Sequence, residues 1–459
     1  RWLDAIYQHI RFASDNYSKY SSADNHLIGE AAGLFVAAHT WNLWADVRQL
    51  RNQAKQILEA EVIKQFSSDG VNTEQAICYH KFSFEFLLAA MLAGENNGDG
   101  FSRKFKTRMQ SAIEFVAAMM DCAGKVPAIG DSDDGKVFEF TDGSDVSGYE
   151  SMLRAGSIVL HSAVASAKLR LLGRAQTPES LWFKVPPSLE PPSQPIEEVD
   201  LPTKFPVGGY FILGKDLHRA TELRVTMDVG PMGSNKIAGH GHADALAVLM
   251  SMAGQDYLVD PGTYCYNAAP AMRQYFRGTS AHNTVLIDRL DQSVYGGSFL
   301  WLRDVNCKVH SYSDDGNIAT VEASHDGYLR LKDPLKHVRM LVLDRTKMCV
   351  SIQDRFECAQ RHQVSLGWHF APECTVKGVG ATWTVQRTAG ELTISVEHAG
   401  LETAVIAGEN NPPDGWLSTR FYQMQPSPVL VSKGTIGPGT ILKTNFTFTP
   451  ATTGSSIDI

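Results

Sequence analysis

Three histidines and two aspartates lie close together in one stretch of the chain, and metal sites and acid–base catalysts are built from such side chains. They are His240, His242, Asp244, Asp260 and His282. Each stands at the edge of a short apolar run that ends in turn residues, and such runs predict β-strands. Polar side chains at strand ends meet where strands join their loops, so we expect these groups to cluster.

Three of these residues have the donor atoms of a metal site. Zn²⁺ takes imidazole nitrogen and carboxylate oxygen in a tetrahedral shell, and His242, Asp260 and His282 supply two nitrogens and one oxygen. The gaps between them suit neighbouring strands rather than one helix. The alternative is structural, because an Asp before Pro-Gly is a common turn residue and a histidine near a strand end is often simply hydrogen-bonded.

The sequence around these residues resembles the heparinase II/III family of polysaccharide lyases. The matching blocks, in chain order, are GHGHAD, LVDPGTY and AHNTV. The resemblance implies one structural zinc ion per chain at His242, Asp260 and His282. It also implies a catalytic role for His240, which stands two residues before the first ligand.

Two polar patches near the start of the chain resemble the same family, and they read SADNHLIGE and TEQAICYH. By residue type alone, Asn25 before an apolar run is typical of a helix N-cap, and Tyr79 of a packing residue. The family takes an Asn (a His in some members) and a Tyr from these patches into its active cleft. The resemblance therefore implies that Asn25 and Tyr79 are catalytic, with His26 and His80 beside them in the cleft.

The net charge of −8 and the pI near 6.0 argue against a general nucleic-acid binder. An acidic protein can still bind an anionic polymer if the cleft itself is basic. Lys236, Arg273 and Arg277 lie near the histidine stretch and are candidates for substrate contact, as is Tyr264. The alternative for each cation is an ordinary surface position.

An acidic loop, GDSDDG at residues 130–135, is similar at first sight to a calcium loop, but it lacks the glutamate that an EF-hand needs. We expect a turn at the rim of the cleft that touches sugar. The seven cysteines include no CxxC pair and predict neither a disulfide framework nor a thiolate zinc site. Cys349 and Cys358 remain candidates for pairing across a hairpin.

Apolar residues at helical spacing predict a helical domain over residues 1–177, ending in one long helix over 149–172. Its helices form a solenoid or a closed ring, and the resemblance favours an α/α toroid, incomplete in this chain. Residues 178–207 are rich in proline and acidic residues and predict a linker. Short β-type runs over 208–459 predict an antiparallel β-sandwich, which makes the chain an α+β multidomain protein.

No apolar run reaches transmembrane length. The chain begins with Arg1 and has no signal sequence, so we expect a mature form or a trimmed fragment. The resemblance implies a periplasmic or secreted protein whose partner is an anionic polysaccharide, with no nucleic acid and no membrane span.

The reaction that the resemblance implies is β-elimination in a uronic-acid polymer. The C5 proton lies α to a carboxylate and is barely acidic, so Asn25 would donate to that carboxylate and stabilise the developing charge. His240 suits the base, because imidazole titrates near neutrality, and Tyr79 suits the acid. For the opposite C5 stereochemistry, Tyr79 would serve as both.

The expected substrates are heparan-type glycosaminoglycans first, with alginate or a bacterial exopolysaccharide next. Two alternatives stay open from the sequence. A zinc hydrolase would use the open metal position, and a non-catalytic polysaccharide-binding or exopolysaccharide-assembly protein would keep the fold without the reaction.

Overall fold

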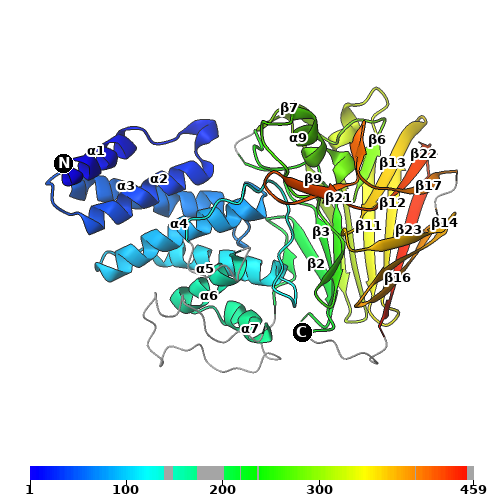
Figure 1. Cartoon of the computed structure of the whole chain (residues 1–459), viewed down its shortest axis with the longest axis horizontal. Helices are drawn as coiled ribbons and strands as arrows, with labels where there is room; N and C mark the ends of the chain where they lie inside the picture. Colours follow the sequence, from blue (N-terminus) through cyan, green and yellow to red (C-terminus); the bar gives the residue numbers. More distant parts are fainter. Residues whose placement is uncertain (139–147, 173–200, 218, 235–236, 398–399, 452–459) are drawn as a thin grey trace.

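The computed structural model describes residues 1–138, 148–172, 201–217, 219–234, 237–397 and 400–451 (Figure 1). Helices occupy the N-terminal part of the chain and strands the C-terminal part, and the two parts lie side by side (Figure 1). The predicted order, a helical region followed by antiparallel sheets, is therefore confirmed.

The helical part is built of antiparallel helices joined by short turns. Its described α-helices are α1 (Trp2–Asp15), α2 (Asp24–Thr40), α3 (Val47–Gln65), α4 (Ile77–Asn96), α5 (Arg103–Met119), α6 (Tyr149–Leu160) and α7 (Ala163–Leu171), with a 3₁₀ turn, η1 (Tyr20–Ser22), before α2. Helix α2 packs against both α3 and α4. One continuous apolar core, including Phe35, Phe84 and Phe115, fills the space between the helices.

The single long helix predicted over residues 149–172 is wrong. The chain breaks at His161, whose φ of +55° is left-handed, and restarts as α7. Ser162 is the N-cap of α7, and its Oγ accepts a hydrogen bond from the Ala165 amide. A serine that caps the next helix offers the backbone an alternative to continuing the first one.

Every strand pairing among the named strands of the β part is antiparallel. The first sheet has the order β1-β2-β3-β4-β5, the second β14-β15-β16-β23-β12-β11-β10-β9, and the third β17-β22-β13-β6. The strands of the first sheet are β1 (Lys204–Phe205), β2 (Tyr210–Lys215), β3 (Leu223–Asp228), β4 (Val248–Met252) and β5 (Gln255–Leu258).

The strands of the second sheet are β9 (Cys307–Asp314), β10 (Ile318–His325), β11 (Lys336–Asp344), β12 (Cys349–Glu357), β14 (Thr375–Val379), β15 (Thr382–Arg387), β16 (Gly390–Glu397) and β23 (Ile441–Pro450). Those of the third are β6 (Val285–Ile287), β13 (His362–His369), β17 (Glu402–Ile406) and β22 (Val429–Ile436). Short ribbons pair β7 (Val294–Gly297) with β8 (Leu300–Arg303), β18 (Glu409–Asn410) with β19 (Pro413–Asp414), and β20 (Trp416–Arg420) with β21 (Gln423–Pro426). Helix α9 (Pro270–Arg277) and two 3₁₀ turns, η4 (Thr279–Ala281) and η5 (Gly327–Arg330), complete the described elements of the β part.

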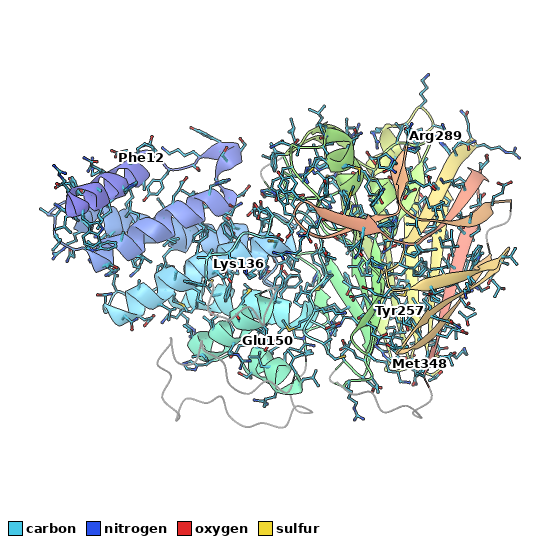
Figure 2. All side chains as sticks on the ribbon, in the orientation of Figure 1. Phe12, Lys136, Glu150, Tyr257, Arg289 and Met348 are labelled. Carbon is cyan, nitrogen blue, oxygen red and sulfur yellow. The ribbon has the colours of Figure 1, made fainter. Side chains whose placement is uncertain are left out.

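The sheets enclose one apolar core, to which Leu223, Ile352 and Trp368 contribute from the first, second and third sheets. Tyr257 on β5 lies inside the β part, whereas Phe12 and Arg289 lie at the surface (Figure 2). Burial alternates along β12, as expected of a strand with one face on a core. This is the predicted antiparallel sandwich.

The helical and β parts are joined by packed side chains rather than by the chain alone. Phe115 of α5 contacts the rings of Phe205 and Tyr210, which belong to the helical core although they lie on β1 and β2. The Tyr210 hydroxyl donates to Gln75 Oε1 at 2.9 Å, and Gln75 Nε2 donates to the Gly208 carbonyl. The relative position of the two parts is thus set by an interface of interior character.

Most of the predicted linker, up to residue 200, lies outside the described residues, but its last residues include β1, which pairs with β2. All seven cysteines are free thiols. Cys349 is the first residue of β12, Cys358 follows its last residue, and both are free thiols, so the hairpin pairing is wrong. In the part of the chain that the structure describes, no helix combines the length and the apolar character needed to cross a membrane.

Candidate active site and metal group

A cleft of about 630 Å³ opens where the helical part meets the β part. Asn25, His26 and Tyr79 line it from the helical side, and His240 and Tyr266 from the β side. Three aromatic side chains, Phe82, Phe86 and Phe299, and four carboxylic side chains, Asp24, Glu30, Glu74 and Asp133, complete much of its wall. Among the described lining residues there is no Lys or Arg.

Tyr79 and His240 are in face-to-face contact in this cleft, with ring centroids 3.7 Å apart and planes inclined by 19°. The Tyr79 hydroxyl donates to Asp133 Oδ2 at 3.2 Å and shares a 2.9 Å hydrogen bond with the hydroxyl of Tyr266. Burial, and then the nearby Asp133 carboxylate, raise the pKa of Tyr79 above that of an ordinary phenol. At neutral pH this hydroxyl is therefore a proton donor.

Tyr266 was not singled out from the sequence, although it stands two residues after Tyr264, which was. Tyr264 does not line the cleft and packs with Phe276 and Tyr422 instead, with centroids 6.3 Å apart in each case. Residues two apart share a face only in extended backbone, and this segment forms no regular strand. The choice between the two tyrosines depends on tertiary structure.

Asp131 joins the cleft to the interior of the β part. Its carboxylate is fully buried and accepts from His240 Nδ1 at 3.1 Å and from His242 Nε2 at 3.0 Å. Arg273 donates to both oxygens, at 2.5 and 2.7 Å. Burial alone would raise the pKa of Asp131, but the Arg273 guanidinium and these hydrogen bonds hold it well below its usual value.

The state of Asp131 sets the tautomer of both histidines. An ionised carboxylate only accepts hydrogen bonds, so it places the proton of His240 on Nδ1 and that of His242 on Nε2. The free lone pair of His240 is then on Nε2, in the cleft. The expectation of a rim turn touching sugar is therefore wrong for Asp131, whereas Asp133 of the same loop does line the cleft.

Arg273 and Arg277, expected as substrate cations, are fully buried on α9. Arg277 donates to the carbonyls of Ala238, Gly239 and Gly241, which flank His240. Arg273 is engaged by Asp131 and by the Ser298 carbonyl. Both guanidinium groups therefore hold the histidine loop in place and do not reach the cleft, and the third expected cation, Lys236, lies outside the described residues.

Gly241, between the two histidines, is required by a close approach. A Cβ at this position would lie 1.6 Å from the carbonyl oxygen of Met232, so no larger residue fits without moving the backbone. The Asp131 amide also donates to the His240 carbonyl at 2.9 Å. The GHGH pattern thus directs two neighbouring imidazoles onto the two oxygens of one aspartate.

Asn25 lies in the first turn of α2, and it is not the N-cap, which is Ala23. Its Nδ2 donates to Glu74 Oε2 at 2.9 Å, and the same carboxyl oxygen lies 3.8 Å from His240 Nε2. His80 does not reach the cleft. It is buried between Phe66 and Phe115, and its Nε2 bonds to the Ala112 carbonyl. Burial lowers the pKa of His80 to about 3, so it is a neutral core residue.

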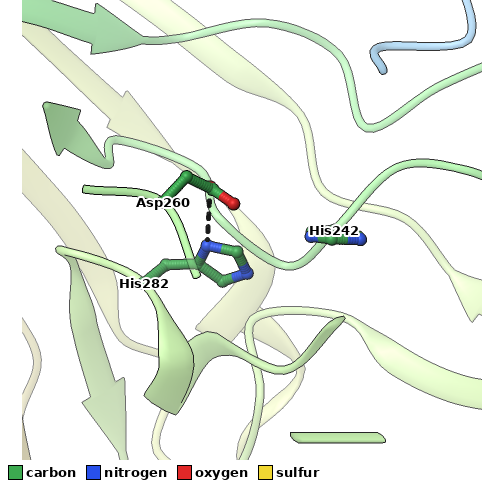
Figure 3. A group of neighbouring side chains, drawn as sticks. All are labelled: His242, Asp260 and His282. Atoms are coloured by element: carbon green, nitrogen blue, oxygen red, sulfur yellow. Dashed lines mark hydrogen bonds and ion pairs between the residues drawn. The ribbon is translucent and has the colours of Figure 1, made fainter. Parts of the chain in front are cut away.

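His242, Asp260 and His282 form a buried group whose ligand atoms lie within 4.8 Å of one another (Figure 3). His282 Nδ1 faces Asp260 Oδ2 at 3.1 Å, which is the contact drawn in Figure 3. Nδ1 of His242 and Nε2 of His282 are buried without a hydrogen-bond partner. Burial lowers the pKa of His242 to about 4, so its imidazole is neutral, as a metal ligand must be.

These residues fit a metal ion. The carboxylate of Asp131 orients His242 through Nε2 and leaves Nδ1 free, which is the usual carboxylate–histidine–metal arrangement. A second group of candidate ligands, Asp333, Cys358 and His362, fits less well. Both ring nitrogens of His362 are already hydrogen-bonded, to Asp288 at 2.7 Å and to Asp333 at 2.9 Å.

Family models match most of the chain. The model described as "Heparinase II/III-like, C-terminal" matches residues 200–441, and that described as "Heparinase II/III N-terminus" matches residues 1–142. The curated proteins compared with the chain include no significant match.

Solved structures share the fold. A structure of heparinase III has a TM-score of 0.76 and 14% identity, covering 98% of this chain and 64% of that one. The heparan sulfate lyase of Pedobacter heparinus has a TM-score of 0.72 and 14% identity, covering 98% of this chain and 63% of that one. The chondroitin AC lyase of Streptomyces coelicolor A3, in complex with chondroitin sulphate, has a TM-score of 0.50 and 11% identity, covering 96% of this chain and 62% of that one. This chain thus spans less than two thirds of the length of these structures.

Proposed function

This chain belongs to the heparinase II/III-like family, and we propose that it cleaves a uronic-acid-containing anionic polysaccharide by β-elimination, leaving a 4,5-unsaturated uronate. The observation that carries this proposal is the contact of Tyr79 with His240 across the cleft, beside the amide of Asn25. An acid, a base and a carboxylate-binding donor are the three groups that the reaction requires.

Each residue has one step in this proposal. Asn25 donates to the carboxylate of the uronate, which gains charge as the C5 proton leaves. His240 takes that proton on Nε2, because Nδ1 is engaged by Asp131. Tyr79 gives its proton to the departing glycosidic oxygen, while Asp133 and Tyr266 hold its hydroxyl in position. For a substrate of the opposite C5 configuration, Tyr79 takes the C5 proton as well.

We propose that the ion held by His242, Asp260 and His282 is Zn²⁺, since two imidazoles and a carboxylate suit it. When bound, it would order the loops that carry these three residues. None of them lines the cleft, and His240 is connected to the group through Asp131. The zinc would therefore brace the catalytic loop.

The alternative of a zinc hydrolase is less well supported, because its metal would have to face the substrate. None of the candidate ligands lines the cleft that holds Tyr79 and His240, and only Asp260 among them lines a second cavity, of about 470 Å³. A non-catalytic polysaccharide-binding protein would not need an imidazole stacked on a phenol beside a buried amide. The proposed substrate is a heparan-type glycosaminoglycan, with alginate or an exopolysaccharide next. The proposed location is the periplasm or the cell exterior, where such polymers occur.

Incubation with a panel of uronate polymers tests the reaction class. A lyase produces unsaturated ends, seen as ultraviolet absorbance, and takes up no water. Saturated reducing ends, combined with complete loss of activity on mild chelation, would identify a hydrolase. Retention on immobilised polymer with no product from any member of the panel would identify a binding protein.

A further inference from the structure

Glu74 is a buried carboxyl group in the wall of the cleft that none of the proposed steps uses. Its side chain is 2% exposed, and it lines the cleft together with Asn25 and His240. Oε2 accepts from Asn25 Nδ2 at 2.9 Å and lies 3.8 Å from His240 Nε2. Oε1 is buried and has no hydrogen-bond partner among the described residues.

The surroundings of Glu74 do not favour a negative charge. Asp24, at the start of α2, faces it with another carboxylate, and Glu30 and Asp133 line the same cleft. The imidazole of His240 lies 3.8 Å from it, and the proton on the other nitrogen of His240 is held by Asp131. The imidazole of His26 lines the same cleft. An ionised carboxylate buried without a cationic partner is costly, and such a group usually takes up a proton instead.

We propose that Glu74 works as a neutral carboxylic acid that donates a hydrogen bond, beside Asn25, to the carboxylate of the bound uronate. The inference rests on the proposed β-elimination. Glu74 lines the same cleft as Asn25 and His240, so a substrate carboxylate seated beside Asn25 would lie next to both donors while its C5 proton faces the base.

The chemistry favours an acid at this position. An ionised Glu74 would repel the uronate carboxylate, whereas a protonated one shares a proton with it. Removal of the C5 proton places further negative charge on that carboxylate. A hydrogen bond donated to the carboxylate is therefore stronger in the transition state than in the ground state. A buried carboxylic acid kept neutral near pH 7 can serve as such a donor.

Protonation also agrees with the electrostatics of the site. Burial raises the pKa of Glu74 to about 7, the nearby His240 opposes this rise, and Asp24 adds to it. The donor form is present below that pH and is lost as the pH rises. Glu74 would therefore set the alkaline limit of the reaction.

The test compares Glu74→Gln, which keeps an uncharged donor at every pH, with Glu74→Ala, which removes it. In the wild type, kcat/KM for unsaturated product should fall about tenfold per pH unit above the ionisation of Glu74. Glu74→Gln should lose that alkaline limb and keep the rest of the wild-type pH profile. Glu74→Ala should lose ~10²–10³-fold at all pH values.

Thermal unfolding gives a readout that needs no substrate. The folded pKa of Glu74 is about 7 and the unfolded one 4.5, so its contribution to stability is complete below the unfolded value and is lost as the pH rises through the folded value. The melting temperature of Glu74→Gln relative to the wild type should therefore increase between about pH 5 and pH 8.

An unchanged alkaline limb in Glu74→Gln would overturn the inference, as would full activity in Glu74→Ala. Loss of activity in Glu74→Gln at every pH would show instead that the ionised carboxylate is needed. If the wild type makes no unsaturated product from any polymer, the proposed function fails and with it the donation to substrate. A melting-temperature difference that does not change with pH would show that Glu74 is ionised in the folded chain.

Discussion

The two oxygens of Asp131 face two groups of side chains with opposite surroundings. On one side is His240, whose side chain is 15% exposed in a cleft shared with Tyr79 and Asn25. On the other are His242, Asp260 and His282, which are 1%, 7% and 1% exposed. The two imidazoles are two residues apart in sequence and bind one carboxylate, yet only one of them can meet a polymer.

Under the proposed function, this difference gives separate tasks to similar residues. A group that exchanges protons with a large substrate must be accessible, whereas a group that holds an ion to order loops is best sealed from water. Arg273 and Arg277 serve both sides, since one neutralises Asp131 and the other binds the carbonyls around His240. Substitutions that change only the cleft group or only the buried group can therefore test whether the two groups have separate tasks.

The largest effect is expected for Tyr79→Phe. The variant loses only the hydroxyl, so its contacts with the rings of His240 and Phe82 remain and the chain should fold. Removal of a general acid costs ~10²–10⁴-fold in rate, and more if the same group is also the base. We expect polymer affinity near that of the wild type and almost no unsaturated product.

Steady-state kinetics and retention on immobilised polymer measure the two quantities separately. Tyr422→Phe is the matched control, because Tyr422 is 57% exposed and does not line the cleft. Tyr79→Phe turnover above about a tenth of wild type would make Tyr79 a packing residue, and the acid would then be sought at Tyr266.

Alanine at each of the paired histidines should give opposite phenotypes. His240→Ala should lose ~10²–10⁴-fold in turnover and keep its metal, because His240 is outside the ligand group. His242→Ala should lose the metal and melt at a lower temperature, since metal binding stabilises the folded state. Metal analysis and thermal unfolding of both variants test this difference. Loss of metal from His240→Ala would show that His240 is a ligand.

Asp131→Asn should damage both sides at once. Loss of an orienting carboxylate costs ~10–100-fold in metal affinity or activity, and Arg273 is left buried without its counter-ion, which typically costs ~3–5 kcal/mol. We expect lower turnover, lower metal content and a lower melting temperature in the same protein. Asp133→Asn is the control, because its carboxylate accepts from Tyr79 and from the Gly135 amide and lies outside the metal group, so this variant should keep its metal. Equal metal content in the two variants would show that Asp131 does not support the metal group.

The sequence predicted that the polar side chains of one contiguous stretch would cluster, and His242, Asp260 and His282 do lie together. His240, His242, Asp260 and His282 are close in the chain, and their spacing around strand ends carries information about which atoms can meet. Helices and strands were predicted for the same reason, because periodicity is local. The break at His161 was missed because a serine cap competes with helix continuation only when tertiary packing allows it.

Asp131, Glu74 and Tyr266 carry no comparable local signal. The role of each carboxylate depends on burial and on partners more than fifty residues away, such as Arg273 for Asp131 and His240 for Glu74. The same limit explains why Arg273 and Arg277 were wrongly expected to contact substrate. Their charge is typical of surface residues, but in the fold they donate hydrogen bonds to buried acceptors. Charge can be read from a sequence, whereas the desolvation that gives it a function cannot.

The smallest effect is expected for Tyr266→Phe, which removes one of the two hydrogen bonds that hold the Tyr79 hydroxyl. Asp133 still accepts from Tyr79, so the acid keeps its direction and only part of its positioning is lost. One hydrogen bond is worth about 0.5–1.5 kcal/mol net, which corresponds to a loss of no more than about tenfold in kcat. Because the change lies wholly in the cleft, metal content and melting temperature should stay at wild-type values. A loss as large as that of Tyr79→Phe would instead show that the proton donor is Tyr266, with Tyr79 serving to orient it.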